Sequence, residues 1–331
     1  MITSMPRGCV AFVLNMLLLA ILVRILSAEA PQRATDRDAR SARPYTAPRT
    51  FWGDPDLQGI WTSDALVDVP FERPESFGTR NELTDAEFAD AQARVRSDFL
   101  PVTAPGSPAH WLEREKASRL ASLIVDPPNG RLPAMTAEGS RRAERWRTTS
   151  ADDYRYERPE DFTPYDRCIT RGVLGSAFPN VYNTGMQIMQ VPGMVVIRYE
   201  MIHETRIIPL DARSHLPSEI RSYMGDPRGH WDGDTLLIET TNFNGRTGSY
   251  GRNGSGNPTS EALRLVERFT LVDRNTMQYE VTVADPQTWT RPWTVRFPIA
   301  RDETYAMFEY GCHEGNYAIA NSLKGARARE R

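Results

Sequence analysis

The chain has 331 residues, with 40 Lys and Arg against 43 Asp and Glu, so its formal net charge is −3. This balance excludes the strongly basic surface that nucleic-acid binding requires, and we expect no nucleic-acid partner. Hydrophobic residues make up 40% and charged residues 25%, which is typical of a water-soluble globular protein with a core. The 24 prolines and 22 glycines favour many turns and few long helices.

The first 30 residues have the plan of a secretory signal peptide. Arg7 precedes an apolar run that continues to Val23, and Ala28 and Ala30 have the small-residue spacing of a cleavage site. Polar residues interrupt the run, which makes it poorer than the roughly 20 apolar residues of a bilayer span. We expect cleavage after Ala30, a periplasmic or secreted protein, and no stable membrane association afterwards. A retained membrane anchor is the alternative.

Export would leave two of the three cysteines in the mature chain, because Cys9 would be removed with the signal peptide. Cys168 and Cys312 would remain, and two cysteines in an oxidising compartment predict one disulfide. Two buried free thiols are the alternative.

The order of the predicted elements indicates a single folded domain over residues 56–331. Residues 31–55 are polar and basic and contain prolines, so we expect a flexible leader there. Thr84 and Glu87 form a capping box that predicts a helix from residue 84 to about residue 99. The rest of an insertion at about 80–165 is expected to consist of loops, with one short helix near residues 138–147.

Short apolar segments between turn signals dominate the chain from Gly185 onward. Asp232-Gly233 between two such segments is a strong hairpin signal. We expect strands at 56–62, 188–191, 194–201, 206–210, 230–231, 235–241, 262–272, 277–284, 293–297 and 304–310. This spacing predicts a mainly β fold, an antiparallel barrel or sandwich with a few short helices. Gly59-x-Trp61 on the first strand is similar to the opening of lipocalin-type barrels, so the expected fold is lipocalin-like.

Four of the expected strands place a glutamate beside apolar residues of the same face, because side chains alternate along a strand. These residues are Glu200, Glu239, Glu267 and Glu309. A carboxylate on an apolar face must be paired, protonated or exposed to a wet cavity. One interpretation is a set of interior ion pairs that fixes strand register, with Arg198, Arg206, Arg268 and Arg291 as partners. The other is a polar-floored pocket inside an apolar barrel, the usual form of a small-molecule site.

Two histidines fall at the ends of expected strands. His203 follows Glu200 by three residues, and His313 follows Cys312, with Glu314 and Asn316 near enough in sequence to orient it. A histidine beside carboxylates can act as an acid or base, or as a ligand of a metal or haem. A histidine that only caps a loop is the structural alternative.

From these patterns we select candidate site residues. The catalytic candidates are His203, His313, Glu200, Glu267 and Glu309. The candidates for contact with substrate are Arg206, Arg268, Glu239, Trp231 and Trp293. The sequence holds no His-Glu-x-x-His, Gly-x-Ser-x-Gly or Cys-x-x-Cys-His motif, which argues against zinc-protease, α/β-hydrolase and c-type haem classes. No motif requires a cofactor or a metal site, and haem or a metal bound through His313 or His203 is the alternative.

The segment from Gly229 to Phe243, GHWDGDTLLIETTNF, resembles a signature of a large group of secreted, largely uncharacterised bacterial proteins. Further segments are similar to the same group: Glu200-x-x-His203-x-x-Arg206, Val266–Phe269, Asp285-Pro286, Arg291–Trp293 and Cys312–Asn316. The resemblance covers roughly residues 56–330 and implies no particular reaction. A more distant similarity, carried by no single motif, is to alkene oxygenases of the trans-anethole oxygenase type.

The sequence thus leads to three functional hypotheses. The first is an exported enzyme that acts on a hydrophobic or aromatic small molecule in a barrel cavity by His/Glu acid–base chemistry, of the lyase, isomerase or hydratase type. The second is a haem- or metal-dependent oxygenase of similar substrates. The third is a protein that binds such a molecule without converting it.

Overall fold

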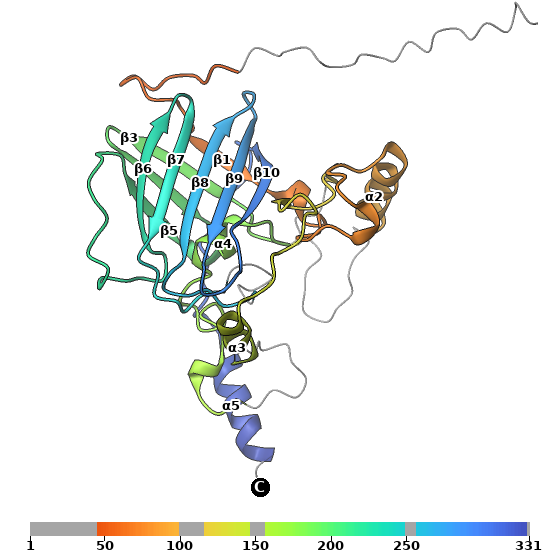
Figure 1. Cartoon of the computed structure of the whole chain (residues 1–331), viewed down its shortest axis with the longest axis vertical. Helices are drawn as coiled ribbons and strands as arrows, with labels where there is room; N and C mark the ends of the chain where they lie inside the picture. Colours follow the sequence, from red (N-terminus) through yellow and green to blue (C-terminus); the bar gives the residue numbers. More distant parts are fainter. Residues whose placement is uncertain (1–44, 99–115, 146–155, 249–255, 330–331) are drawn as a thin grey trace, which may run out of the picture. The chain divides into compact units, whose positions relative to one another are not determined.

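Ten short strands build one antiparallel sheet in the computed structural model, which describes residues 45–98, 116–145, 156–248 and 256–329 (Figure 1). Nine of them follow the order β5-β4-β3-β1-β10-β9-β8-β7-β6, and β2 pairs with β10 beside this path. The strands are β1 Gly59–Thr62, β2 Ile124–Asp126, β3 Met186–Val191, β4 Met194–Tyr199, β5 Thr205–Pro209, β6 Asp226–Asp232, β7 Thr235–Thr241, β8 Arg264–Leu271, β9 Thr276–Ala284 and β10 Trp293–Arg301. The expected mainly β fold is confirmed.

The sheet curls into a nearly closed barrel because its two end strands, β5 and β6, come together. A side chain at Gly229 on β6 would lie 2.7 Å from both Ile208 on β5 and Leu210 just beyond it. Glycine is therefore needed where the two ends of the sheet approach each other.

Alternation along the strands decides which side chains fill the barrel. On β8 the buried residues are Leu265, Glu267, Phe269 and Leu271, as the sequence pattern predicted. Phe269 lies directly across from Tyr279 on β9, with ring centroids 4.9 Å apart. Because β7, β9 and β10 alternate in the same way, the interior is a packed apolar core with a few polar groups inside it.

Helices are few and short. They are η1 Asp64–Leu66, η2 Glu75–Phe77, α2 Asp85–Asp98, α3 Ala137–Arg145, η4 Pro159–Asp161, α4 Gly172–Ala177, η5 Met201–His203 and α5 Ala318–Arg329. The expected capping box is present, because the Glu87 carboxylate accepts from the backbone N–H of Thr84 and the Glu87 N–H donates to the Thr84 hydroxyl. Figure 1 shows α3 and α5 beyond the end of the strands that is drawn downward.

Two expectations about the chain ends need correction. Residues 304–310 are not a strand, because β10 itself continues to Arg301 and the Asp302 carboxylate then accepts from the Thr304 N–H in a turn. Residues 45–55 are packed rather than flexible, since Ala47 is buried and its N–H donates to Asp234. The packed part of the chain therefore begins before residue 56. The expected signal peptide lies outside the described residues.

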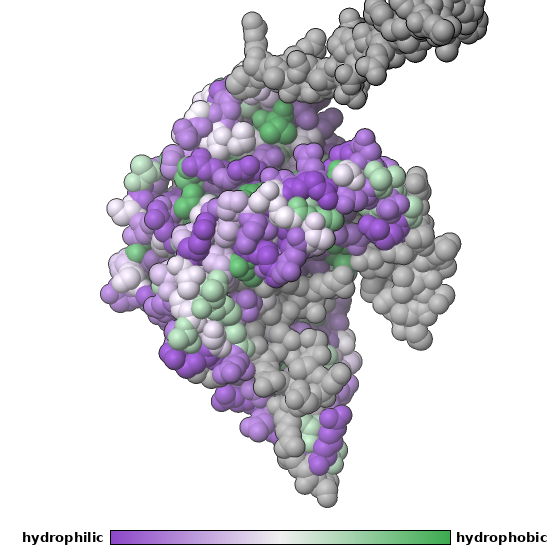
Figure 2. Space-filling view, turned by 45° about the vertical axis from the view of Figure 1, so that its right-hand side comes forward, coloured by the Kyte–Doolittle hydropathy of each residue, from purple (hydrophilic) through white to green (hydrophobic). Residues whose placement is uncertain are grey.

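On the face drawn in Figure 2, hydrophilic residues cover most of the coloured surface, and apolar residues form small separate groups. Within the described residues, no helix has the length and apolar character to cross a bilayer.

Candidate functional site

A buried ion pair lies in the middle of the barrel. The two terminal nitrogens of Arg206 donate to the two carboxylate oxygens of Glu267, at 2.9 and 2.5 Å, and both side chains are almost completely buried. The Tyr279 hydroxyl donates to Glu267 at 3.0 Å, and Arg206 also donates to the Tyr199 hydroxyl and to Thr240. Arg206 and Glu267 are thus the one predicted Glu–Arg pair that occurs inside the barrel among the described residues.

The charges of this pair neutralise each other. Burial lowers the pKa of Arg206, but the negative charge of Glu267 and the contacts with Tyr199 together outweigh that effect and raise the pKa above its ordinary value. Burial raises the pKa of Tyr199 to about 12 and raises that of Tyr279 well above its ordinary value, so both phenols keep their protons. A carboxylate with both oxygens bonded to an arginine is poorly suited to take up a proton from a substrate, and we interpret this pair as structural.

A pocket adjoins this network at one end of the barrel. Apolar and polar residues both line it: the apolar ones include Trp61, Phe178, Met186, Phe269 and Phe297, and the polar ones include Arg171, Ser176, Asn180, Asn183, Tyr199 and Tyr279. The hollow measures about 450 Å³ including its open mouth, but only about 20 Å³ of it is wide enough for water. Apolar walls with a few convergent polar groups are the usual composition of a small-molecule site.

Arg171 is the charged residue of the pocket wall. Its side chain is 4% exposed, and its Nε has no hydrogen-bond partner. No described carboxylate makes an ion pair with it. The guanidinium lies over the Tyr165 ring, 5.2 Å from the centroid, and burial lowers its pKa.

Three tyrosines form a hydroxyl cluster beside Arg171. The Tyr165 hydroxyl lies 3.0 Å from that of Tyr182 and 3.0 Å from that of Tyr310, and it also contacts the sulfur of Met201, a residue of the pocket wall. Burial raises the pKa of Tyr165 and of Tyr182 to about 12, and raises that of Tyr310 as well. The cluster is therefore a set of neutral hydrogen-bond donors at neutral pH.

Two carboxylates, the buried Glu200 and the half-buried Glu204, bond polar residues that line the pocket. Glu204 accepts from the hydroxyls of Thr170 and Ser176, and burial raises its pKa. Glu200 accepts from Asn183 at 2.8 Å and from the Tyr305 hydroxyl at 2.7 Å. Because Ser176 and Asn183 line the pocket, each carboxylate acts on it through one intermediate side chain.

The disulfide joins the two segments that carry this cluster. Cys168 and Cys312 are bonded, as the sequence predicted. Cys168 follows Tyr165 by three residues, and Cys312 follows Tyr310 by two. The covalent bond therefore holds Tyr310 against Tyr165, although the two tyrosines are far apart in the sequence.

Strained backbone surrounds the same place. Cys168, Asn183, Ile202 and His203 all have positive φ, between 44° and 58°. For Ile202, a β-branched residue, this conformation is a genuine outlier. Such residues cost about 1–3 kcal/mol each and gather at ligand-binding and active sites.

Of the five catalytic candidates, the structure brings only Glu200 and Glu267 into the interior. His203, His313 and Glu309 are exposed. Glu309 was expected on a core-facing strand, and its exposure follows from the absence of that strand. Neither Glu314 nor Asn316 bonds the His313 ring; the Asn316 amide donates instead to the sulfur of Cys168.

The five residues that were expected to contact substrate do not lie together in the structure either. Arg206 is paired inside the barrel, whereas Glu239 and Arg268 lie on its outer face, where Glu239 bonds Arg264 and Arg268 faces Glu280. The face chosen for Glu239 was wrong, because Leu236, Ile238 and Thr240 are the residues of β7 that point inward. Trp293 is buried in the core against Trp289, and Trp231 is half-buried on β6; neither lines the pocket.

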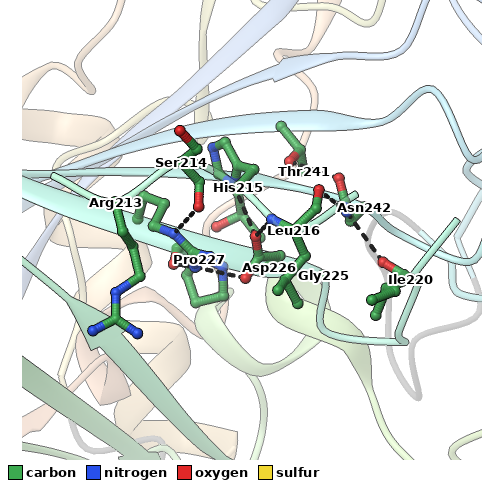
Figure 3. Close-up of polar contacts among 12 residues, drawn as sticks. Arg213, Ser214, His215, Leu216, Ile220, Gly225, Asp226, Pro227, Thr241 and Asn242 are labelled. Carbon is green, nitrogen blue, oxygen red and sulfur yellow. Dashed lines mark hydrogen bonds and ion pairs between the residues drawn. The ribbon is translucent and has the colours of Figure 1, made fainter. Parts of the chain in front are cut away.

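A second polar cluster anchors the loop before β6 (Figure 3). The ring nitrogen Nδ1 of His215 lies 3.1 Å from Asp226, which also accepts from the Leu216 N–H, and Asn242 donates to three backbone carbonyls of the loop. The Arg228 guanidinium occupies the other oxygen of Asp226. With every acceptor engaged in holding the loop, we interpret this cluster as structural.

In the part of the chain that the structure describes, no three His, Cys, Asp or Glu side chains are grouped so as to hold a metal ion. A metal or haem ligated by His203 or His313 stays a prediction.

No protein-family model matches the chain, and no curated protein matches it significantly. The resemblance to secreted bacterial proteins therefore also stays a prediction.

Sequence reasoning missed Arg171, Glu204 and the three tyrosines. One signal was available: a disulfide between Cys168 and Cys312 must bring Tyr165 and Tyr310 near each other, because disulfide-bonded Cα atoms lie within about 7 Å. Nothing in the local pattern distinguishes Arg171 from the other arginines, since the groups that surround it, among them Glu204 and Tyr310, come from segments far apart in sequence.

Proposed function

We propose that this chain is an exported protein that binds a small, largely apolar molecule in the barrel-end pocket and acts on it by proton transfer. Export is supported by the signal-like first 30 residues and by the disulfide. The observation that carries the proposal is the buried Arg171 at the wall of this pocket, with the cluster of three tyrosine hydroxyls directly behind it.

The chemistry follows from the protonation states. A substrate oxygen that becomes negative as a proton leaves a neighbouring carbon would be stabilised by the guanidinium of Arg171 at the pocket wall. The phenols behind Arg171, with a pKa near 12, stay protonated and add no opposing negative charge. Glu204, whose pKa burial raises, is suited to receive that proton, and Ser176 connects it to the pocket. Groups whose pKa values are pushed apart mark the acid and the base of such a site. This favours a lyase, isomerase or hydratase type of reaction.

Binding without conversion is the second candidate. The exposure of His203 and His313 favours it, because the two histidines on which acid–base chemistry was first based lie outside the pocket.

The test is a screen of purified mature protein against apolar ketones, phenols and alkenes, by thermal shift with mass-spectrometric product analysis. On a converted compound, Tyr165→Phe should lower kcat by about 10²-fold, the lower end of the effect of losing a direct oxyanion donor, because it removes the hydroxyl that joins Tyr182 and Tyr310 behind Arg171. Tyr317→Phe, at an exposed tyrosine, is the matched control and should be unchanged.

Two results would contradict the proposal. Stabilisation without any product favours a binding protein, and full turnover by Tyr165→Phe places the chemistry elsewhere. An absorption spectrum and metal analysis of the same sample test the oxygenase alternative, since a Soret band or a transition metal would support it.

A further inference from the structure

Three arginines are buried among the described residues, and they differ in what they contact. Arg206 is paired with Glu267, and Arg73 donates to Asn81 and to the backbone carbonyl of Pro128. The Arg171 side chain, in contrast, donates to no described residue. It is also the one of the three that lines the pocket.

The cost of such an arrangement is large. Removing a charged group from water is costly even after the surroundings relax. The contact with the Tyr165 ring offsets only a part of that cost. The remainder implies a missing anion.

The neighbouring acids do not provide that anion. The hydroxyls of Tyr165, Tyr182 and Tyr310 are neutral, because burial raises the pKa of each. Glu204 already accepts from Thr170 and Ser176, and the one contact it makes with Arg171 is to the backbone N–H, at 3.4 Å. The negative charge of Glu204 acts on Arg171, but burial outweighs it and leaves the pKa of Arg171 lowered. The guanidinium at the pocket wall therefore has no ion-pair partner among the described residues.

We propose that the pocket binds its ligand through a singly charged oxygen, a carboxylate or a phenolate, placed against the guanidinium of Arg171. This inference rests on the proposed function and specifies its ligand class. The neutral hydroxyl cluster behind Arg171 places no competing negative charge there, and Phe178, Met186 and Phe269 of the wall contact an apolar body. The ligand is thus an amphipathic acid or phenol rather than a neutral hydrocarbon.

The size of the hollow adds one condition. A ligand larger than a water molecule must open the mouth further, because about 20 Å³ is room for one water only. The apolar part of the ligand must therefore displace side chains of the wall, and small aromatic probes are the appropriate first choice.

The experiment compares matched probes that differ only in charge. Benzoate with benzamide, and 2-naphthoate with 2-naphthamide, are titrated into the full mature protein by isothermal calorimetry at pH 7.5. We expect each acid to bind at least 10-fold more tightly than its amide. Arg171→Met should remove that preference, and Arg171→Lys should retain part of it. Arg274→Met, at an exposed arginine, is the control and should bind like the wild type.

The outcomes separate the two proposals. Equal binding of acids and amides overturns the charge inference and leaves an apolar pocket intact, whereas binding of neither series overturns both. A second readout does not need a ligand: Arg171→Met should raise the Tm, since it removes an uncompensated buried charge. A large fall in Tm would identify Arg171 as a structural cation and overturn the inference.

Discussion

At the scale of single residues, the ionisable groups in and behind the pocket wall have pKa values that burial shifts. The backbone N–H of Arg171 donates to the Glu204 carboxylate, but the two side chains lie in different environments. Glu204 is held by hydroxyls, which stabilise its charge less than an arginine would, and burial dominates its pKa. This makes Glu204 the residue of the site most sensitive to pH.

The sign of that sensitivity can be tested. Because the folded pKa of Glu204 lies above the ordinary value of 4.5, the folded state binds its proton more tightly than the unfolded state. The contribution of Glu204 to the free energy of unfolding therefore falls as the pH rises from about 4.5 through the folded pKa. Glu204→Gln should be more stable relative to the wild type at pH 8 than at pH 4, in urea denaturation at both values.

An exposed glutamate provides the control for this experiment. Glu219→Gln should show the same difference from the wild type at pH 4 and at pH 8. A Glu204→Gln profile parallel to that of Glu219→Gln would mean that Glu204 titrates as if in water.

At the scale of elements, the barrel closes around a charged pair carried by β5 and β8. These strands are not neighbours in the sheet, so Arg206 reaches Glu267 across the interior. Tyr199 on β4 and Tyr279 on β9 complete the network and also line the pocket. The pair thus links four strands to the wall of the candidate site.

Removing one partner of this ion pair should lower the free energy of unfolding more than replacing both partners by apolar residues. Arg206→Met leaves the Glu267 charge buried without a partner and should lower the free energy of unfolding by about 3–5 kcal/mol. The double variant Arg206→Met with Glu267→Leu should be less destabilised than Arg206→Met alone, because no isolated charge remains. Urea denaturation of the two single variants and the double variant measures both effects; additive losses would show that the two side chains do not depend on each other.

At the scale of the whole molecule, the disulfide connects the C-terminal segment to the chain that precedes α4. It closes a loop with a sequence separation of 144 and holds Tyr310 beside Tyr165. The segment 302–316 contributes no strand, so side-chain contacts and this bond attach it to the barrel end; they include the contacts of Glu200 with Tyr305 and Phe308 and that of Tyr310 with Tyr165.

Removing the disulfide should therefore affect both stability and the pocket. For a loop of this length, the chain-entropy model predicts a loss of about 5 kcal/mol for Cys168→Ser with Cys312→Ser. We expect denaturation at lower urea concentration, with the circular-dichroism signal of the sheet retained in buffer. Ligand binding should weaken even where the sheet persists. Unchanged stability would contradict the inference that the disulfide holds the C-terminal segment in place.

The sequence alone determined most of the strands, the capping box of α2, the hairpin at Gly233 and the inward face of β8; it missed β2 and predicted a strand at 304–310 that is absent. These features depend on local periodicity and turn chemistry, which neighbouring residues specify. It also predicted the disulfide, because cysteine pairing follows from their number and the expected compartment.

Tertiary structure alone decided where charges lie. Glu267 was placed correctly because β8 alternates regularly, whereas Glu239 was placed on the wrong face because both faces of β7 carry apolar side chains. Arg171 and the tyrosine cluster could not be recognised in advance, since their burial comes from segments far apart in sequence that only the folded chain brings together. Local pattern specifies elements; the environment of an ionisable group depends on what the rest of the chain packs against it.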